Sequence, residues 1–243
     1  MEKTIEHGSF IPLYHQLKEI LKEKIESGEW ESGDKLPSEH ELQRNYDISR
    51  NTVKKALDDL VQEGMLNRIQ GKGTFVSKPK FEQSLSGFYS FSKVLKQKGL
   101  NPKDIIISIE EKTVKPSIAR QLQIASDTEV FDLKRLRCAN DEPIILETSY
   151  IPKTIIPELS VEQLDHYSLY DYMEQVYDVS VTKAKEIFEP VLVRDYESHY
   201  LEIQEGRPAL MLDRLAYDAK GTPVEFCRSI VRGDRCRFYT ELI

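Results

Sequence analysis

The stretch PSEHELQRNYDISRNTVKKALDDLVQEGMLNRIQGKGTFV, residues 37–76, decides how the first third of the chain folds. Pro37 blocks a helix that runs in from upstream, because proline lacks a backbone N–H and clashes with the preceding turn. Ser38 can cap a new helix, and Glu41 stands three residues later, where it can reach back to the cap. The pattern therefore predicts a short helix from Ser38 to about Asn45.

A second helix follows a turn, with Ser49 as its N-cap and Gly64 at its end. Its apolar residues recur at helical spacing and form one stripe: Val53, Ala56, Leu57, Leu60 and Val61. Its other face carries groups that reach phosphates and base edges, crowded at the helix N-terminus: Arg50, Asn51, Thr52, Lys54 and Lys55. In helix-turn-helix proteins the N-terminal end of the second helix enters the major groove, and we call this helix the reading helix.

A β-hairpin is expected next, with strands at 66–69 and 74–76. Its tip holds Gly71, Lys72 and Gly73, which have little bulk and can approach a DNA backbone or minor groove. Each feature alone is typical of ordinary core packing or an ordinary turn. In this order and spacing they predict a winged helix-turn-helix domain, in preference to an unrelated helical domain.

Charge supports a local DNA-binding surface. The formal net charge is -7, which argues against a protein that coats nucleic acid indiscriminately. Residues 1–43 hold five Lys/Arg against ten Asp/Glu, whereas residues 44–78 hold seven against four. The local balance thus turns positive where the reading helix and the hairpin begin, although a solvated charged surface has the same pattern.

Cysteine usage and hydropathy argue against disulfide-bonded, zinc-binding, secreted and membrane proteins. The three cysteines lack Cys-x-x-Cys spacing and are odd in number, so the sequence predicts neither a disulfide framework nor a zinc site. We expect no metal, no cofactor and no catalytic residue. Without a signal-peptide core or a long apolar run, the chain is expected to be cytoplasmic, with no membrane partner.

The N-terminal part resembles the GntR family of bacterial transcription regulators over about residues 11–78. A helix from Pro12 to about Gly28 is expected before the two helices that Ser38 and Ser49 cap. The shared motifs are Ile11-Pro12-Leu13-Tyr14, Gly28-Glu29-Trp30, Gly33 to Glu39, Ser49 to Val53, Glu63-Gly64 and Gly71 to Val76. The resemblance implies that His40, Arg50, Thr52 and Gly71 meet the operator. Many relatives have arginine in place of His40, and histidine offers one donor at a time, so the base preference there is open.

We predict that the DNA-binding residues are these four and several polar residues near them in the sequence. The full set is Ser38, His40, Ser49, Arg50, Asn51, Thr52, Lys54, Gly71 and Lys72. The partner is expected to be double-stranded, pseudo-palindromic operator DNA, read by a homodimer with half-sites about one helical turn apart. The domain is expected to span 1–78, with a linker at 79–86 and a second domain at 87–243.

The second half alternates strands and helices. Strands are expected near 105–114, 129–138, 144–151, 181–192, 208–218, 223–232 and 236–242, and helices over 88–98, 116–124, 168–177 and 195–203. An internal repeat appears when residue n is placed over residue n+79, since Leu133 then matches Leu212 and Arg135 matches Arg214. Two such units predict one antiparallel sheet with pseudo-twofold symmetry.

This half resembles the effector-binding UTRA domain of the HutC subfamily, whose fold is like that of chorismate lyase. The markers are Leu85-Ser86-Gly87 with Ser90-Phe91, Arg135-Leu136-Arg137, Pro143, Glu147, Tyr150 to Pro152, Ser168 to Tyr170, Glu225 and Arg232 to Arg235. The fold class is therefore α+β: a winged helix-turn-helix domain followed by a mixed α/β domain with an antiparallel sheet.

The expected ligand site combines anion donors with carboxylates. Arg135 and Arg137 are two apart on a strand and share a face, and their guanidinium groups suit phosphate or carboxylate. The resemblance, which includes responders to amino-sugar phosphates, gives the set Ser90, Phe91, Arg135, Arg137, Glu147, Ser168, Tyr170 and Glu225. A purely structural Arg135–Glu147 pair across the hairpin is the alternative. Val231 stands where N-acetylglucosamine-phosphate responders have an aromatic residue, which leaves the sugar open.

The sequence thus predicts a dimeric regulator, a repressor of a sugar or amino-sugar utilisation operon, controlled by a small phosphorylated sugar. An enzyme with a chorismate-lyase-like fold is one alternative, but no Ser/His/Asp or Cys/His order and no metal-ligand cluster supports it. A GntR regulator whose second domain only dimerises is the other.

Overall fold

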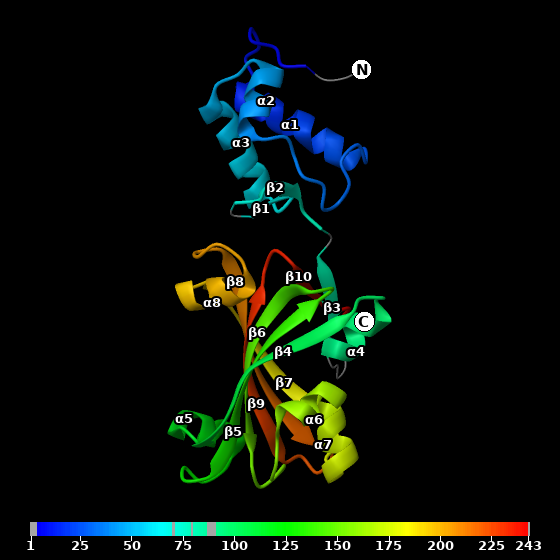
Figure 1. Ribbon diagram of the computed structural model, residues 1–243, viewed down its shortest axis with the longest axis vertical. Helices are drawn as coiled ribbons and strands as arrows, with labels where there is room; N and C mark the ends of the chain where they lie inside the picture. Colours follow the sequence, from blue (N-terminus) through cyan, green and yellow to red (C-terminus); the bar gives the residue numbers. More distant parts are fainter. Residues whose placement is uncertain (1–3, 70, 79, 87–90, 243) are drawn as a thin grey trace. The chain divides into compact units, whose positions relative to one another are not determined.

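The computed structural model describes residues 4–69, 71–78, 80–86 and 91–242. The chain divides into two compact units, Met1–Pro79 and Lys80–Ile243. Figure 1 labels the helices and strands of both. Within the described ranges, no helix is long and apolar enough to cross a membrane.

The described residues of the first unit form three helices and a hairpin, as predicted: α1 (Leu13–Glu26), α2 (Glu39–Tyr46), α3 (Arg50–Gln62), β1 (Leu66–Ile69) and β2 (Gly73–Val76). Ser38 and Glu41 form the predicted capping box at α2, and the Ser49 hydroxyl accepts a hydrogen bond from the Thr52 N–H at the start of α3. Asp47 ends α2 in the left-handed region, at φ 50°. The two capped helix starts therefore fix the turn between α2 and α3.

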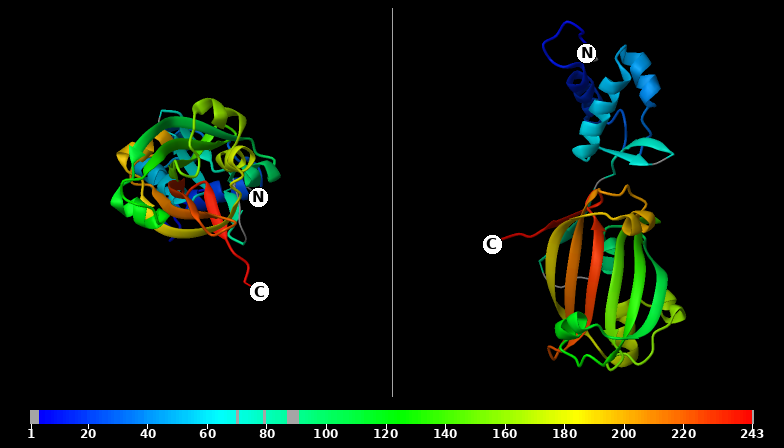
Figure 2. Two further views of the ribbon diagram at one scale, coloured as in Figure 1. Left: turned by 90° about the horizontal axis from the view of Figure 1, so that it is seen from below. Right: turned by 90° about the vertical axis from the view of Figure 1, so that its left-hand side faces the viewer.

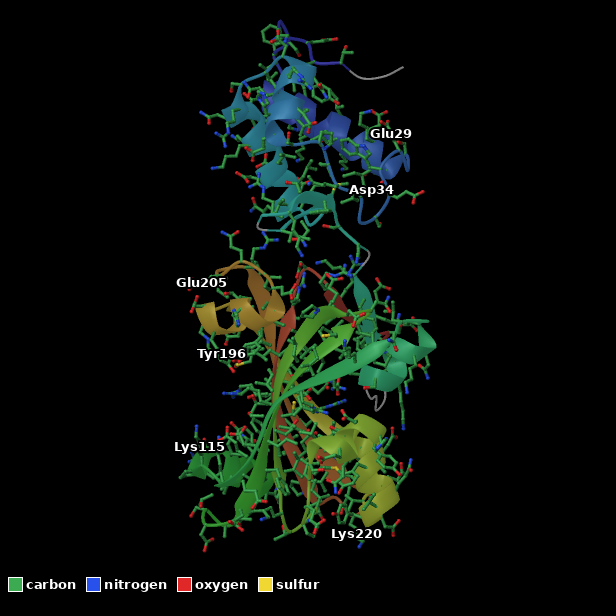
Figure 3. The ribbon with its side chains drawn as sticks, viewed as in Figure 1. Glu29, Asp34, Lys115, Tyr196, Glu205 and Lys220 are labelled. Carbon is green, nitrogen blue, oxygen red and sulfur yellow. The ribbon has the colours of Figure 1, made fainter. Side chains whose placement is uncertain are left out.

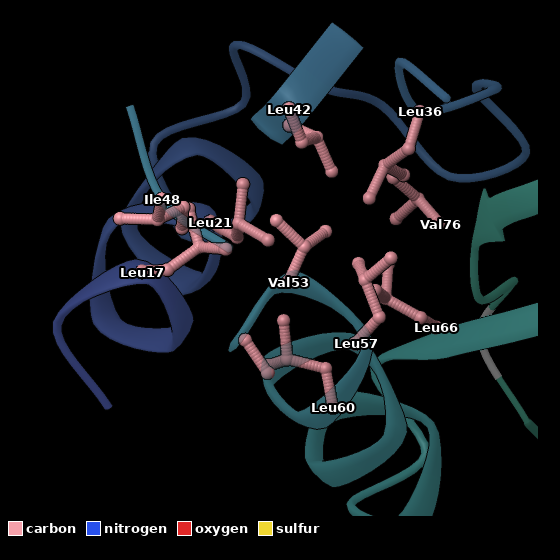
Figure 4. Packing of buried hydrophobic residues seen from close by; sticks show 11 residues of the cluster. Leu17, Leu21, Leu36, Leu42, Ile48, Val53, Leu57, Leu60, Leu66 and Val76 are labelled. Carbon is pink, nitrogen blue, oxygen red and sulfur yellow. The ribbon is translucent and has the colours of Figure 1, made fainter. Parts of the chain in front are cut away.

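A single apolar core holds this unit together. The stripe predicted on α3 is buried from Val53 to Leu60 and packs against Leu17 and Leu21 of α1, Leu42 of α2 and both strands (Figure 4). Trp30 is partly buried against the same cluster. Because helices and hairpin share one core, the polar N-terminus of α3 is held in a fixed position relative to β1 and β2.

The second unit is built on a six-stranded antiparallel sheet in the order β4-β5-β6-β9-β8-β7. Its strands are β4 (Pro102–Thr113), β5 (Glu129–Ala139), β6 (Glu142–Pro152), β7 (Val181–Leu192), β8 (Pro208–Asp218) and β9 (Pro223–Arg232). Figure 2 shows them as one curved layer.

The internal repeat is confirmed at the level of whole elements. β4, α5 (Pro116–Leu122) and β5 are followed 79 positions later by β7, α8 (Asp195–Leu201) and β8, with matching first and last residues. The central contact is between β6 and β9, so the two halves meet at the middle of the sheet. Arg135 on β5 and Arg214 on β8 consequently occupy equivalent places.

Helices cover both faces of the sheet. On one face α5 packs on Val130 and Phe226, and α8 packs on Leu136 and Leu146; Lys115 and Tyr196 mark these two helices in Figure 3. The other face is covered by α4 (Phe91–Gln97), α6 (Val161–His166) and α7 (Leu169–Tyr177). Residue 135 belongs to this second face, because side chains alternate along a strand.

The expected linker at 79–86 is wrong for its middle part. Phe81–Ser84 forms strand β3, which pairs in parallel with β10 (Cys236–Tyr239). The reason is packing, since Phe81 and Phe238 lie against the same core cluster as Phe91. The last strand also ends earlier than expected, and α6 was not predicted. Residues 88–90 of the expected helix 88–98 lie outside the described part.

Candidate functional site

The predicted DNA-binding residues lie on three elements of the first unit. Ser38 and His40 stand at the start of α2, Arg50 to Lys54 at the start of α3, and Gly71 with Lys72 at the hairpin tip. All nine are exposed except Thr52, which is half-buried. Lys72 donates its N–H to Ile69 O at 3.0 Å, which closes the tip. A helix N-terminus with exposed polar side chains can receive phosphate oxygens.

Glu39 connects α3, which is the reading helix, with the β1–β2 hairpin, which is the wing. Its carboxylate lies 3.4 Å from Arg50 Nε on α3 and 3.4 Å from Arg68 Nη2 on β1. The Arg50 side chain is nevertheless 77 % exposed, so it is available to a partner. Lys55, by contrast, lies over the Tyr14 ring at 3.9 Å and is held against α1.

A polar cavity lies on the α7 side of the large sheet. Seven of the eight predicted ligand residues line it: Phe91, Arg135, Arg137, Glu147, Ser168, Tyr170 and Glu225. Ser90, the eighth, lies outside the described residues. Strands β5, β6 and β9, the first turn of α7 and the start of α4 each contribute a wall, and thus the cavity collects residues that are far apart in sequence.

The arginines of this cavity are paired with buried carboxylates. The Arg135 guanidinium donates to the Glu147 carboxylate, which is directly opposite on β6, and to Asp104 Oδ2 at 3.3 Å. Arg137 donates to Asp104 at 3.1 Å and to Glu147 at 3.3 Å. The cross-strand pair Arg135–Glu147, which was the structural alternative to a ligand site, is therefore present. Both of its side chains also line the cavity.

The buried charges stabilise one another. Burial by itself would raise the pKa of Glu147, but the guanidinium groups of Arg135 and Arg137 lower it to about 2. Burial would likewise lower the pKa of Arg137, whereas the Asp104 and Glu147 carboxylates raise it above its ordinary value. Glu147 and Arg137 are consequently ionised at neutral pH.

The first turn of α7 supplies a second kind of donor. The Ser168 hydroxyl caps the helix, accepting from the Asp171 N–H at 3.3 Å and donating to the Asp171 carboxylate at 2.6 Å. Tyr170 donates its hydroxyl to Glu225 Oε2 at 2.6 Å, and burial raises the pKa of Tyr170 well above its ordinary value. The positive end of the α7 dipole thus faces the cavity beside a tyrosine that stays protonated.

Two charged residues of this site were not predicted. Arg214 lines the cavity and lies 3.0 Å from Glu186 on β7, and Asp104 holds both β5 arginines from β4. The repeat offers a signal for Arg214, since it matches Arg135. The sequence offers no signal for Asp104, because the pairing of β4 with β5 that places it opposite Arg137 includes an irregularity between Ile106 and Ser108.

Family models match both units. Residues 13–76 match the model described as bacterial regulatory proteins of the gntR family, and residues 97–237 match the UTRA domain. The chain belongs to the GntR family of bacterial regulatory proteins. The predicted resemblance to this family and its HutC subfamily is confirmed, and so is the α+β fold class.

Relatives of this GntR-family chain are named transcriptional regulators. It is 38% identical to the HTH-type transcriptional repressor NagR of Bacillus subtilis (strain 168), over 97% of this chain and 96% of that protein. It is 30% identical to a probable fructoselysine utilization operon transcriptional repressor of Escherichia coli (strain K12), over 89% and 90%. The prediction of a regulator rather than an enzyme agrees with these relatives.

Two solved structures have a similar fold. The crystal structure of PhnF from Mycobacterium smegmatis has a TM-score of 0.62 at 26% identity, covering 95% of this chain and 98% of that one. That of YydK, a possible transcriptional regulator from Bacillus subtilis, has a TM-score of 0.58 at 23% identity, covering 95% and 99%.

Proposed function

We propose that this GntR-family regulator represses a sugar or amino-sugar utilisation operon and that a small phosphorylated sugar controls its affinity for the operator. The names of its relatives support the first part, because they include NagR, a fructoselysine utilization operon repressor and a repressor of mannosyl-D-glycerate transport and metabolism. The cavity supports the second part.

The observation that carries the effector proposal is the arrangement of opposite charges in one cavity. Arg135, Arg137 and the N-terminus of α7 can hold a phosphate, since forked guanidinium donors and helix N-termini both bind oxyanions. Glu147 and Glu225 can accept hydrogen bonds from sugar hydroxyls or an amine. The existing ion pairs must partly exchange for ligand contacts, which favours a ligand with both kinds of group over a simple anion.

DNA binding is assigned to residues 1–78, and effector binding and dimerisation to residues 87–243. In the first region the start of α3 enters the major groove, with Arg50, Asn51 and Thr52 toward the bases. Ser38, Ser49 and Lys54 contact the backbone, and Gly71 with Lys72 places the wing against the adjacent groove. A homodimer then reads a pseudo-palindromic operator with two such surfaces.

The test is thermal unfolding of the full chain with hexose phosphates, amino-sugar phosphates and their unphosphorylated parents. A ligand at a hundred times its dissociation constant adds about 2.7 kcal/mol of stability by mass action. We expect only phosphorylated sugars to raise the midpoint. Equal shifts with the unphosphorylated parents, or no shift at all, would contradict the effector proposal and leave DNA binding untouched.

The effector that raises the midpoint is then added to the chain bound to fluorescent operator DNA. A change in anisotropy-measured affinity is expected, because a ligand that binds two states unequally shifts their populations. An affinity that does not depend on the ligand would contradict the proposed control of operator binding. If no ligand changes either the midpoint or the affinity, a second domain that only dimerises is supported instead.

A further inference from the structure

A second cavity adjoins the first beneath β3 and β10. Its walls are mainly apolar and include Phe81, Ile145, Leu212 and Phe238. The two cavities share five wall residues, namely Phe91, Arg137, Glu147, Arg214 and Cys227. The two cavities are therefore adjacent, and only side chains that belong to both walls lie between them.

Gln83 is the unusual residue of the second cavity. It lies on β3 and is only 3 % exposed. Its side-chain Nε2 donates to Ser84 O at 2.7 Å, whereas Oε1 has no hydrogen-bond partner among the residues that the structure describes. The orientation of the amide is fixed by Ser84, because a rotated carboxamide would place two oxygens against each other.

A buried acceptor without a donor is unfavourable. Leaving one unpaired costs about 1–3 kcal/mol, and native proteins satisfy nearly all such groups. No wall side chain that the structure describes donates to Gln83 Oε1. Phe81, Ile145 and Phe238 have only carbon side chains, and the donors elsewhere in the wall, such as Arg137 and Ser229, form no hydrogen bond with it. A molecule that enters the cavity, either a water or a ligand, can supply the missing donor.

We infer that the second cavity receives a short aliphatic substituent of the effector that carries one N–H or O–H donor, and that Gln83 Oε1 accepts this hydrogen bond. The inference rests on the proposed function, because it assigns a further part of the same ligand. It predicts an effector with two parts: a polar anionic head in the first cavity and a donor-bearing aliphatic arm in the second. Gln83 thereby determines specificity for the arm.

The test uses a matched pair of small amides on the full chain. N-methylacetamide has an N–H donor, and N,N-dimethylacetamide lacks it. Binding is followed by the ¹⁵N NMR signals of the Gln83 side-chain amide, which are assigned by their loss in Gln83→Met. We expect N-methylacetamide to bind about tenfold more tightly, as one buried hydrogen bond allows. In Gln83→Met the two amides should bind within about twofold of each other, as judged from neighbouring backbone signals.

Gln204→Met, at an exposed position, is the control and should keep the tenfold preference. Equal binding of both amides to the unaltered chain, or no change in the Gln83 signals with either, would overturn the inference and leave the cavity as a packing void or a water site. If Gln83→Met is unfolded, Gln83→Leu replaces it. Glucose 6-phosphate alone, which has no such arm, tests the polar cavity, so the failure of either proposal is recognised separately.

Discussion

Arg135 and Glu147 face each other across β5 and β6, and both side chains are almost completely buried. The pair is not isolated, because Arg137 and Asp104 extend it to a network of four charges. Removing one member of such a network leaves an opposite charge uncompensated in a place that water does not reach. The charge network thus stabilises the second unit and also forms part of the cavity wall.

Glu147→Gln is expected to destabilise the second unit by about 3–5 kcal/mol at pH 7, as for other broken buried ion pairs. Because the pKa of Glu147 is lowered to about 2 in the folded state, its contribution is complete above the ordinary carboxyl pKa and is lost as the pH falls from about 4.5 toward 2. Urea unfolding at several pH values should therefore show the difference between variant and unaltered chain shrinking with acid. The exposed Glu205→Gln should show no such difference (Figure 3).

Ser49→Ala should destabilise the first unit by about 1 kcal/mol, because the Thr52 N–H loses its acceptor at the start of α3. Trp30 is the single tryptophan and packs on the core of this unit, so its fluorescence during urea unfolding reports on residues 1–79 alone. Ser32→Ala, at an exposed site, is the control. A Ser49→Ala midpoint equal to that of the control would mean that the cap contributes nothing.

Arg50→Ala should weaken operator binding by about 1–3 kcal/mol, the range for an arginine that contacts bases. The fluorescence anisotropy of labelled operator measures the effect. Arg50→Lys separates the two kinds of contact, since lysine keeps the charge but loses the fork that recognises guanine. Lys220→Ala removes a positive charge from the β8–β9 loop and is the control, which should leave the affinity unchanged (Figure 3). An equal loss of affinity in both variants would mean that net charge, rather than the reading helix, explains the effect of Arg50→Ala.

Gly73→Ala should strain the wing. Gly73 has φ +124°, which side chains rarely adopt, and an added Cβ would lie 2.8 Å from Lys35 Cε. A backbone held in this region costs about 1–3 kcal/mol, so we expect a lower unfolding midpoint by Trp30 fluorescence and weaker operator binding. Gly8→Ala meets nothing within 4 Å and serves as the control; equal midpoints for both variants would show that the wing tolerates the side chain.

The sequence predicted those elements whose signals are local. Ser38 and Ser49 mark helix starts by their own hydrogen bonds, and the apolar stripe from Val53 marks the buried side of α3. Strands β7, β8 and β9 begin and end at the predicted residues, because alternating burial and flanking turns are visible in the chain itself.

What the sequence did not predict depends on partners distant in the chain. Phe81–Ser84 is a strand only because Cys236–Tyr239 lies beside it, so Gln83 looks like a linker residue when β10 is ignored. Asp104 meets Arg137 through a register that contains an irregularity, which no local pattern indicates. The cavity residues were found chiefly by family resemblance, since strand alternation alone places Arg135 on a face without showing what lies over it.

The 79-residue repeat has a consequence for how ligands are distinguished. If two identical halves met at an axis, every side chain on one side would have a copy on the other, and an asymmetric molecule on that axis would bind equally well in either of two orientations. Joining the halves in one polypeptide removes that equivalence. Arg135 and Arg214 still match, yet their cross-strand neighbours are Glu147 in one half and Cys227 in the other. The difference between the two halves thus allows the cavity to favour one orientation of an asymmetric small molecule over the other.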